Sequence, residues 1–585
     1  MAVGTADGQG RRVRFTVSAF RRNVNYRLHS SFLYAWRYAG RVPDRLTIAP
    51  IDLRTADPTA ALDIYAGRWV FDGEGLDIEG FSVYDAVAPS ENWARNLHSF
   101  GWLRHLRASD HEEATDAAKA LVGEWIGFSS HHDPVAHAPE ITARRLIAWF
   151  SQAPIILESA DHDFYRRFMK SVGRQVRYLR RVAYDGPPGL PRLKVMIALA
   201  TAAISLSDQP RFLKQASRRL DLELVNQILP DGGHISRNPA AVLEALTDLL
   251  PLRQAFSVQG NQPSHVLVSA IDRMMPMLRF MRMGDGSLGR FNGIGDTTTD
   301  LTATILKYDD IRGALPEGAK HSGFHRFAAG NTVVLVDTGR PPPIEFSTDA
   351  HAGTLSFEMS VGPQALIVNC GAPAPGARAL RRLARTTAAH STVTVNDTSS
   401  YRFMEHAGST ELVGDAVASG PSKVDIDRRH TGDATILTAQ HDGWATRYAV
   451  AHRRSLRFTD EGDMLEGTDS FLTPGGGKRR SGKDRFAIRF HIHPDIRVRE
   501  RPETRSVVFE FPHGELWELE ADAGDLRIEE SILMAGNRGN RETDQVVIYG
   551  RVQHTPQVAW RIYRTGIARR RARRLPPPPG ENRND

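Results

Sequence analysis

The spacing of apolar residues changes near residue 320, and this change limits the folds that the chain can adopt. Between residues 110 and 282 apolar residues recur every three or four positions, which predicts a series of amphipathic helices. One such face consists of Phe164, Phe168, Val172, Val176 and Leu179. From about residue 325 to 567, short β-branched and aromatic runs follow a period of two, which predicts antiparallel strands. Hairpin turns are expected at residues 362–363, 460–463 and 512–514.

Helices first and strands second is the pattern of two separately packed domains. A chain of 585 residues is also too long for one compact core. We predict a helical domain with an N-terminal extension over residues 1–320, a large antiparallel β-domain over 321–567, and a disordered, basic, proline-rich tail over 568–585. Successive antiparallel helix pairs stack into a curved or closed toroid, whose groove would meet the β-domain and form a cleft suited to a ligand.

Charge and glycine patterns argue against nucleic acid and nucleotide partners. The net charge is +7, from 75 Lys and Arg against 68 Asp and Glu, but residues 561–585 hold eight Arg against two acidic residues, so the body is close to neutral. A solvated tail is favoured over an anionic-surface anchor because four consecutive prolines forbid a continued helix. No glycine-rich phosphate-binding fingerprint follows a predicted strand, and this argues against nucleotide chemistry.

Apolar runs and cysteine content leave the compartment open. No run of 18 apolar residues exists, so no transmembrane segment is expected, and no apolar stretch of signal-peptide length follows the N-terminal arginines. The single cysteine, Cys370, excludes an intramolecular disulfide and a cysteine-based zinc ribbon. The sequence does not indicate an oligomeric state.

Three segments place histidines and other polar residues beside turns. In DGGHISRNP, the turn at residues 231–233 is followed by three candidate site residues, His234, Arg237 and Asn238. The alternative interpretation is structural: a helix starts here, with Asn238 as its N-cap and Pro239 as its first residue. His351 and His390 each precede a strand. A lone histidine at the end of a strand is more often structural. Two imidazoles together with an oxygen ligand would, however, suit zinc. A fourth polar segment without histidine, GRFNGIGDTTTD, is favoured as a glycine-rich connector near the domain junction.

Six segments in order resemble the heparinase II/III-like polysaccharide lyases. They are RNLHSFGWLRHL, QVRYL, DGGHISRNP, FNGIGD, HAGTLSFE and AHSTVTVND. The resemblance implies an (α/α) toroid followed by an antiparallel β-sandwich domain. It also implies β-elimination on a uronic-acid polysaccharide, of the heparin or heparan type or a bacterial exopolysaccharide, bound between the domains.

β-Elimination requires donors that neutralise the uronate carboxylate, a base that removes the C5 proton, and an acid that protonates the leaving oxygen. From the resemblance, His234, Arg237 and Asn238 are expected to neutralise the carboxylate, and His351 and His390 to transfer protons. Tyrosines are the alternative proton carriers. The predicted substrate-binding residues are Tyr184, Asn292, Asp296 and Tyr401.

The sequence departs from the family pattern at two places. Residues 187–194 stand where an Asn-His pair normally follows the QxxYL helix, and Ala240 and Ala241 stand where a catalytic tyrosine is expected. The usual base is therefore absent. These departures are compatible with a lyase whose acid and base have moved, or with a protein that keeps the fold without the activity.

The resemblance also implies a structural zinc site in some members, at positions that match His351, Asn369 and His390. Asp349 and Gly353 replace other residues of the family's histidine motif, and Asn369 stands where a carboxylate is usual. Because a charged ligand is lost, we expect a hydrogen-bonded histidine cluster in preference to bound zinc, and no other cofactor.

The interpretation favoured by the sequence is a polysaccharide lyase. The alternative is a catalytically degenerate polysaccharide-binding accessory of cell-envelope or exopolysaccharide production. A glycoside hydrolase would need two carboxylates facing each other across the groove, and no obvious pair is present. The family resemblance points to the cell envelope or periplasm, with a cytoplasmic location left open by the absence of a visible signal peptide.

Overall fold

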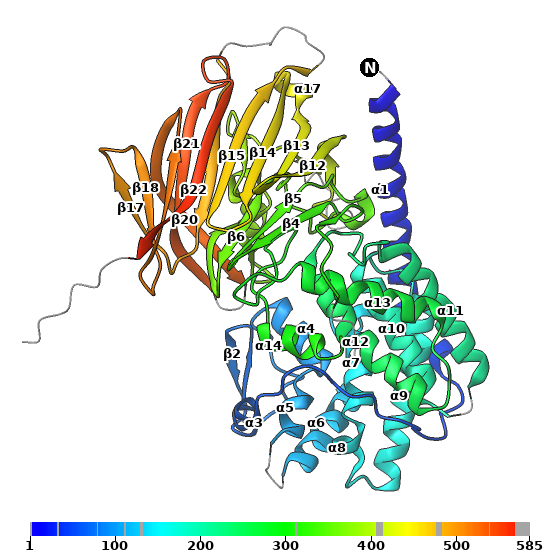
Figure 1. The fold of residues 1–585 in the computed structure, drawn as a ribbon. Coiled ribbons are helices and arrows are strands. Elements are labelled where there is room, and N and C mark those ends of the chain that lie inside the picture. The colour runs from blue at the N-terminus through cyan, green and yellow to red at the C-terminus, as the bar shows by residue number, and fades with distance from the viewer. Residues whose placement is uncertain are drawn as a thin grey trace, which may run out of the picture.

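A computed structural model describes residues 3–31, 34, 36–78, 80–109, 113–128, 133–207, 209–309, 313–404, 414–474, 483–536 and 539–567. The predicted tail, 568–585, lies outside the described residues. The chain forms a helical part followed by a part built of antiparallel sheets (Figure 1), which confirms the predicted fold class. The last helix of the helical part ends at Leu306 and the strands of the second part begin at Gly318, while the exact domain limits stay predictions. The second part also contains the short helices α15 (Arg378–Ala384) and α17 (Ala445–Tyr448).

The helical part contains a series of helices joined by short turns. Before residue 110, where the predicted series of helices begins, the chain also forms a small hairpin of β1 (Arg68–Phe71) and β2 (Glu74–Asp77). The sequence pattern does not predict this hairpin. The α-helices are α1 (Val3–His29), α3 (Pro58–Tyr65), α4 (Glu91–Ser99), α5 (Leu103–Arg107), α6 (Ala114–Phe128), α7 (Pro139–Ser151), α8 (Ala153–Leu157), α9 (His162–Val182), α10 (Leu190–Ser205), α11 (Pro210–Gln227), α12 (Pro239–Val258), α13 (His265–Phe280) and α14 (Thr299–Leu306).

Inner and outer helices differ in how much of their surface is apolar. Every residue of α10 from Leu193 to Ser205 is buried, and α10 packs against α7, α11 and α12. Such a helix is apolar on all sides because it lies inside the toroid. Helix α9 is instead amphipathic and buries the predicted stripe that runs from Phe164 to Leu179, while its other face carries arginines.

A tight turn between α11 and α12 depends on glycine. Gly232 has φ +85°, and a Cβ there would lie 1.9 Å from the carbonyl oxygen of Arg273, so no other residue fits. Asn238 then caps α12, its side chain accepting from the backbone N–H of Ala240 at 2.9 Å, and Pro239 is the first helical residue. The predicted helix start at Asn238 is confirmed, and the turn places Arg237 at the edge of the β-domain.

Two large sheets form most of the second part, and they are antiparallel except where β8 pairs with β20 in parallel. One large sheet has the order β12-β13-β14-β15-β22-β19-β18-β17 and the other β3-β4-β5-β6-β7-β16-β21-β20-β8, with β9 beside β16. A further small sheet pairs β10 (Arg402–Phe403) with β11 (Val417–Ser419). The three predicted hairpin turns join β6 to β7, β14 to β15 and β18 to β19. The strands are β3 (Gly318–Ala319), β4 (Phe324–Ala329), β5 (Thr332–Asp337), β6 (Phe357–Val361), β7 (Gln364–Val368), β8 (Gly371–Pro373), β9 (Val393–Val395), β12 (Val424–Thr431), β13 (Ala434–Trp444), β14 (Val450–Thr459), β15 (Met464–Leu472), β16 (Arg485–Ile492), β17 (Arg497–Arg501), β18 (Ser506–Glu510), β19 (Glu515–Ala521), β20 (Asp525–Gly536), β21 (Asn540–Arg551) and β22 (Gln557–Ile567).

The core of the β-sandwich lies between the two sheets. Phe357 of one sheet stacks on Trp560 of the other with ring centroids 5.8 Å apart. Beneath them, Asp469 accepts hydrogen bonds from Arg454, His452 and the indole of Trp560. Because Arg454 also donates to the carbonyl oxygen of Ser391, at 3.0 Å, this buried ion pair connects the core to the segment that carries His390.

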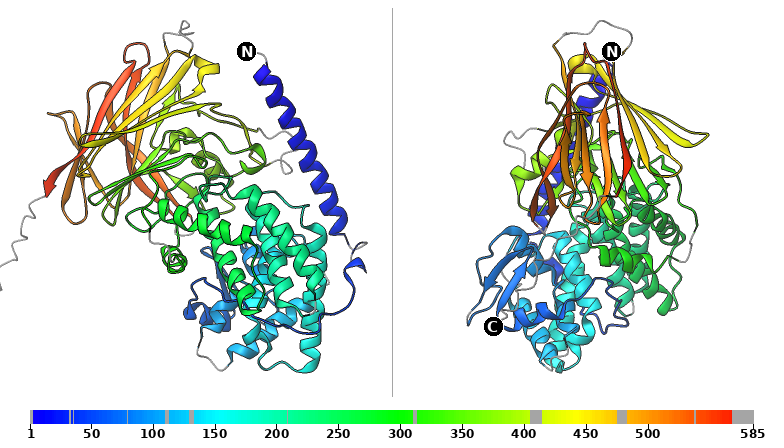
Figure 2. Two further views of the ribbon diagram at one scale, coloured as in Figure 1. Left: turned by 45° about the vertical axis from the view of Figure 1, so that its right-hand side comes forward. Right: turned by 60° about the vertical axis from the view of Figure 1, so that its left-hand side comes forward.

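Helix α1 (Val3–His29) lies against both parts of the molecule (Figure 2). Phe15 packs with Ala416 and Ile344 of the β-domain, while His29 bonds Asp185 of the helical part at 2.6 Å. The opposite face of α1 exposes Val13, Val17, Phe20, Val24 and Leu28. Among the described residues, no helix is long and apolar enough to cross a membrane.

Candidate functional site at the domain junction

A chain of hydrogen bonds connects four of the predicted site residues where the two parts meet. The side-chain amide of Asn292 donates to the carbonyl oxygen of Arg237 at 3.2 Å, and its Oδ1 accepts from the backbone N–H of His351 at 3.2 Å. Nδ1 of His351 lies 3.2 Å from Nε2 of His390. Residues from two domains, up to 153 positions apart (390 − 237), thus form one buried junction cluster, which we define as Arg237, Asn292, His351, His390 and their direct partners.

The two histidines of the junction cluster form an uncharged pair. His390 Nδ1 lies 2.8 Å from the carbonyl oxygen of Thr386, so it carries the proton and leaves Nε2 to accept from His351. Burial lowers the pKa of His390 to about 4 and holds the pKa of His351 well below its usual range. Both imidazoles are 3% exposed or less. The expected hydrogen-bonded histidine pair is therefore present.

Arg237 is fully engaged within the protein. Its guanidinium pairs with Asp337 at 2.5 Å and donates to the carbonyl oxygens of Ser322, Arg340 and Gly323. The family resemblance predicts that this guanidinium binds a uronate carboxylate. In the structure the carboxylate it meets is Asp337, and Arg237 instead holds the turn before α12 against the first strands of the β-domain.

His234 and Asn238, the other two residues expected to neutralise the uronate, also have internal partners. His234 is 1% exposed and bonds Gln227 at 2.9 Å and Ser236 at 2.7 Å, and burial lowers its pKa to about 4. Asn238 caps α12 as described above. Both side chains therefore support the turn that precedes α12.

The residues matched to the zinc site do not make a complete set of metal ligands. Asn369 Oδ1 accepts from the backbone N–H of Ser391 at 2.9 Å, and its amide donates to the carbonyl oxygen of Arg290. A Cβ at Gly353 would lie 2.8 Å from the ring of His390, so a carboxylate side chain does not fit there. Across the part of the chain that the structure describes, no three His, Cys, Asp or Glu side chains are placed to hold a metal. Two imidazoles and an amide whose oxygen already accepts a backbone hydrogen bond do not form a zinc site.

The predicted substrate-binding residues are only partly brought together. Tyr401 belongs to the junction cluster: it is 2% exposed, its hydroxyl lies 3.0 Å from that of Thr354, and burial raises its pKa. Asn292 belongs there as well, and Asp296 is half-buried in the same loop. Tyr184 lies elsewhere, 42% exposed, with its ring beside the guanidinium groups of Arg192 and Arg219.

The structure also reveals a charged group that sequence analysis missed, at the centre of the toroid. Glu244 of α12 accepts from Lys194 of α10 and from Arg144 of α7. The side chains of Arg144 and Glu244 are 43% and 39% exposed, unlike the junction cluster. We call these three residues the toroid-centre cluster. Charged residues inside otherwise apolar inner helices, such as Lys194, are the sequence signal that could have revealed it.

An (α/α) toroid joined through a buried polar junction to an antiparallel β-sandwich defines the heparinase-like class of proteins. Residues 312–561 match the family model described as heparinase II/III-like, C-terminal. A crystal structure of heparinase III shares the fold with a TM-score of 0.66 at 12% identity, over 91% of this chain and 89% of the other. The heparan sulfate lyase HepC from Pedobacter heparinus has a TM-score of 0.58 at 16% identity, over 92% and 88%.

One curated relative aligns along most of the chain. FtsZ-localized protein C from Caulobacter vibrioides is 30% identical over 530 residues, which cover 89% of this chain and 90% of the relative. The chain belongs to the heparinase II/III-like family, as a divergent member.

Proposed function

We propose that this chain binds an anionic, uronic-acid-containing polysaccharide of the cell envelope and does not cleave it through the junction cluster. The observation that carries the proposal is burial: His234, His351, His390 and Tyr401 are each 3% exposed or less. A base must reach the C5 proton of a uronate within hydrogen-bond distance, and a buried imidazole cannot do so without opening the domain junction. In this proposal the junction cluster holds the two domains together.

The toroid-centre cluster provides the proposed contact with the polysaccharide. Arg144 lies on α7 with its side chain 43% exposed and offers a cationic donor to carboxylates, whereas Lys194 is buried and pairs with Glu244. Glu244 lies between them and holds both side chains in position.

A second candidate function is β-elimination with Lys194 as the base. Lys194 ends the segment 187–194 that stands where the family's Asn-His pair is expected. Burial and the neighbouring Arg144 lower the pKa of Lys194, while Glu244 opposes this shift. A lowered pKa increases the fraction of neutral amine that can accept a proton at neutral pH.

Incubation of the pure protein with a panel of uronate polysaccharides separates the two candidates. We expect saturable binding without the ultraviolet absorbance of an unsaturated product. An increase in absorbance that disappears in Lys194→Met but persists in His351→Ala would contradict the binding proposal and support the second candidate. Lys214→Met, which removes an exposed lysine of α11, is the matched control and is expected to leave both readouts unchanged.

The name of the Caulobacter relative supports one addition, that this chain is also found with FtsZ in the cell. A fluorescent fusion imaged beside labelled FtsZ is then expected to give coinciding signals in dividing cells. Independent distributions of the two signals would contradict this addition without affecting the polysaccharide proposal.

A further inference from the structure

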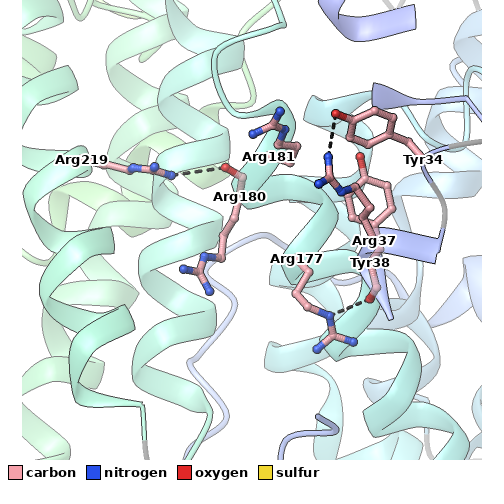
Figure 3. A pocket seen from close by; sticks show the side chains of 7 residues that line it. All are labelled: Tyr34, Arg37, Tyr38, Arg177, Arg180, Arg181 and Arg219. Carbon is pink, nitrogen blue, oxygen red and sulfur yellow. Dashed lines mark hydrogen bonds between the residues drawn. The ribbon is translucent and has the colours of Figure 1, made fainter. Parts of the chain in front are cut away.

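A basic pocket lies on the outer surface of the helical part, between α9, α11 and the short helix η1 (Trp36–Tyr38) (Figure 3). Its volume is about 380 Å³, within the range of roughly 300–1,000 Å³ that is usual for small-molecule sites. It is lined by Tyr34, Arg37, Tyr38, Arg177, Arg180, Arg181 and Arg219. None of these residues belongs to the junction cluster or to the toroid-centre cluster.

The five arginines of the basic pocket bond only neutral groups. Arg177 donates to the carbonyl oxygen of Tyr38 at 2.6 Å, Arg37 to the hydroxyl of Tyr34 at 3.0 Å, and Arg219 to the carbonyl oxygen of Arg180 at 3.4 Å, as Figure 3 shows. Arg180 donates to Oε1 of Gln215, and Arg181 donates to Nε2 of His29, whose Nδ1 lies 2.6 Å from Asp185. Over the described residues, no carboxylate lies within ion-pair distance of any of the five, although ion pairs are common elsewhere in the chain.

The positive charges of the basic pocket repel one another. The pKa of Arg177 is lowered by burial and by Arg180, and the pKa of Arg180 is lowered by burial and by Arg219. Repulsion of this kind opposes folding, so the arrangement does not serve stability. A bound anion would relieve it.

We infer that the basic pocket binds a phosphate group, either a pyrophosphate-like ion or the phosphate ester of a larger molecule. Arginine forks match phosphate oxygens in pairs, and a phosphate presents oxygens in several directions with more than one negative charge. A carboxylate presents two oxygens in one plane with a single charge and would leave most of the five guanidinium groups without a counter-charge. The pocket volume leaves room for a group beyond the phosphate, beside the rings of Tyr34 and Tyr38.

Calorimetric titration of the full chain with pyrophosphate at constant ionic strength tests this inference. We expect one saturable site, and an increase in melting temperature because a ligand that binds only the folded state stabilises it. The double variant Arg180→Gln/Arg219→Gln is expected to bind pyrophosphate at least about tenfold more weakly, since each charge-assisted hydrogen bond contributes roughly a factor of ten or more. The same variant should melt no lower than the parent without ligand, because repulsion is removed.

The matched control is the double variant Arg211→Gln/Arg218→Gln, which removes two exposed arginines of α11 that do not line the pocket. Absence of saturable pyrophosphate binding, or equal weakening in the two double variants, would overturn the inference. Stronger binding of an oligogalacturonate than of pyrophosphate at this site would overturn the choice of phosphate. Binding to phosphatidylglycerol vesicles but not to phosphatidylcholine vesicles, lost in the first double variant, would identify a lipid headgroup as the source, whereas pyrophosphate binding alone would identify a soluble one.

Discussion

Lowering the pH from 7 to 5 is expected to destabilise the folded chain by several kcal/mol, because it contains neutral buried histidines. Burial lowers the pKa of His234, His325 and His390 from 6.5 to about 4. At pH 5 each stays neutral in the folded chain and becomes protonated in the unfolded chain, which corresponds to about 2 kcal/mol for each fully buried imidazole. Because the unfolded state binds more protons between pH 6.5 and 4, stability is complete above pH 6.5 and falls as the pH decreases.

Urea unfolding at pH 7, 6 and 5 measures this dependence. His390→Gln is expected to reduce the pH slope of the unfolding free energy by about one proton between pH 6.5 and 4. His265→Gln, at an exposed position of α13, is the control and should leave the slope unchanged. A slope that is the same for the parent and for His390→Gln would show that His390 does not titrate as its burial indicates.

Replacing Arg237 by Ala is expected to destabilise the chain by about 3–5 kcal/mol, the usual cost of breaking a buried ion pair by removing one partner. The change leaves Asp337, whose side chain is 2% exposed, without its counter-charge, and it frees the carbonyl oxygens that Arg237 binds across the domain junction. Denaturant unfolding gives the magnitude. Arg340→Ala, which truncates an exposed neighbour, should change the stability by no more than about 0.5 kcal/mol.

A double-mutant cycle with Asp337→Asn shows whether the loss comes from the ion pair. The second substitution is expected to restore part of the stability that Arg237→Ala removes, because it eliminates the unpaired charge. Because Arg237 affects binding only by stabilising the fold, binding of uronate chains and of neutral glucans should weaken to the same extent in Arg237→Ala. Selective loss of uronate binding with unchanged stability would show that Arg237 binds the uronate carboxylate directly, as the family resemblance predicts.

The fold class was predictable because local spacing determines the type of each element. The stripe from Phe164 to Leu179 specifies which face of α9 is buried, and the glycine and proline turns specify where hairpins and helices begin. These signals depend on neighbouring residues only, so they can be read from the sequence without knowledge of the tertiary arrangement. The ordered family motifs then indicated how the helical and β parts are arranged.

The partners of the polar residues were decided by tertiary structure alone. Arg237 carries the same charge whether it faces a uronate or Asp337, and nothing near it in sequence indicates a carboxylate 100 positions away. The basic pocket likewise needs arginines from two helices and from η1, which become neighbours only when the toroid closes. The sequence by itself determined the order and type of elements, because these follow local periodicity. Only the folded chain decided which charges are buried in pairs and which remain without a counter-charge, because that depends on contacts between distant segments.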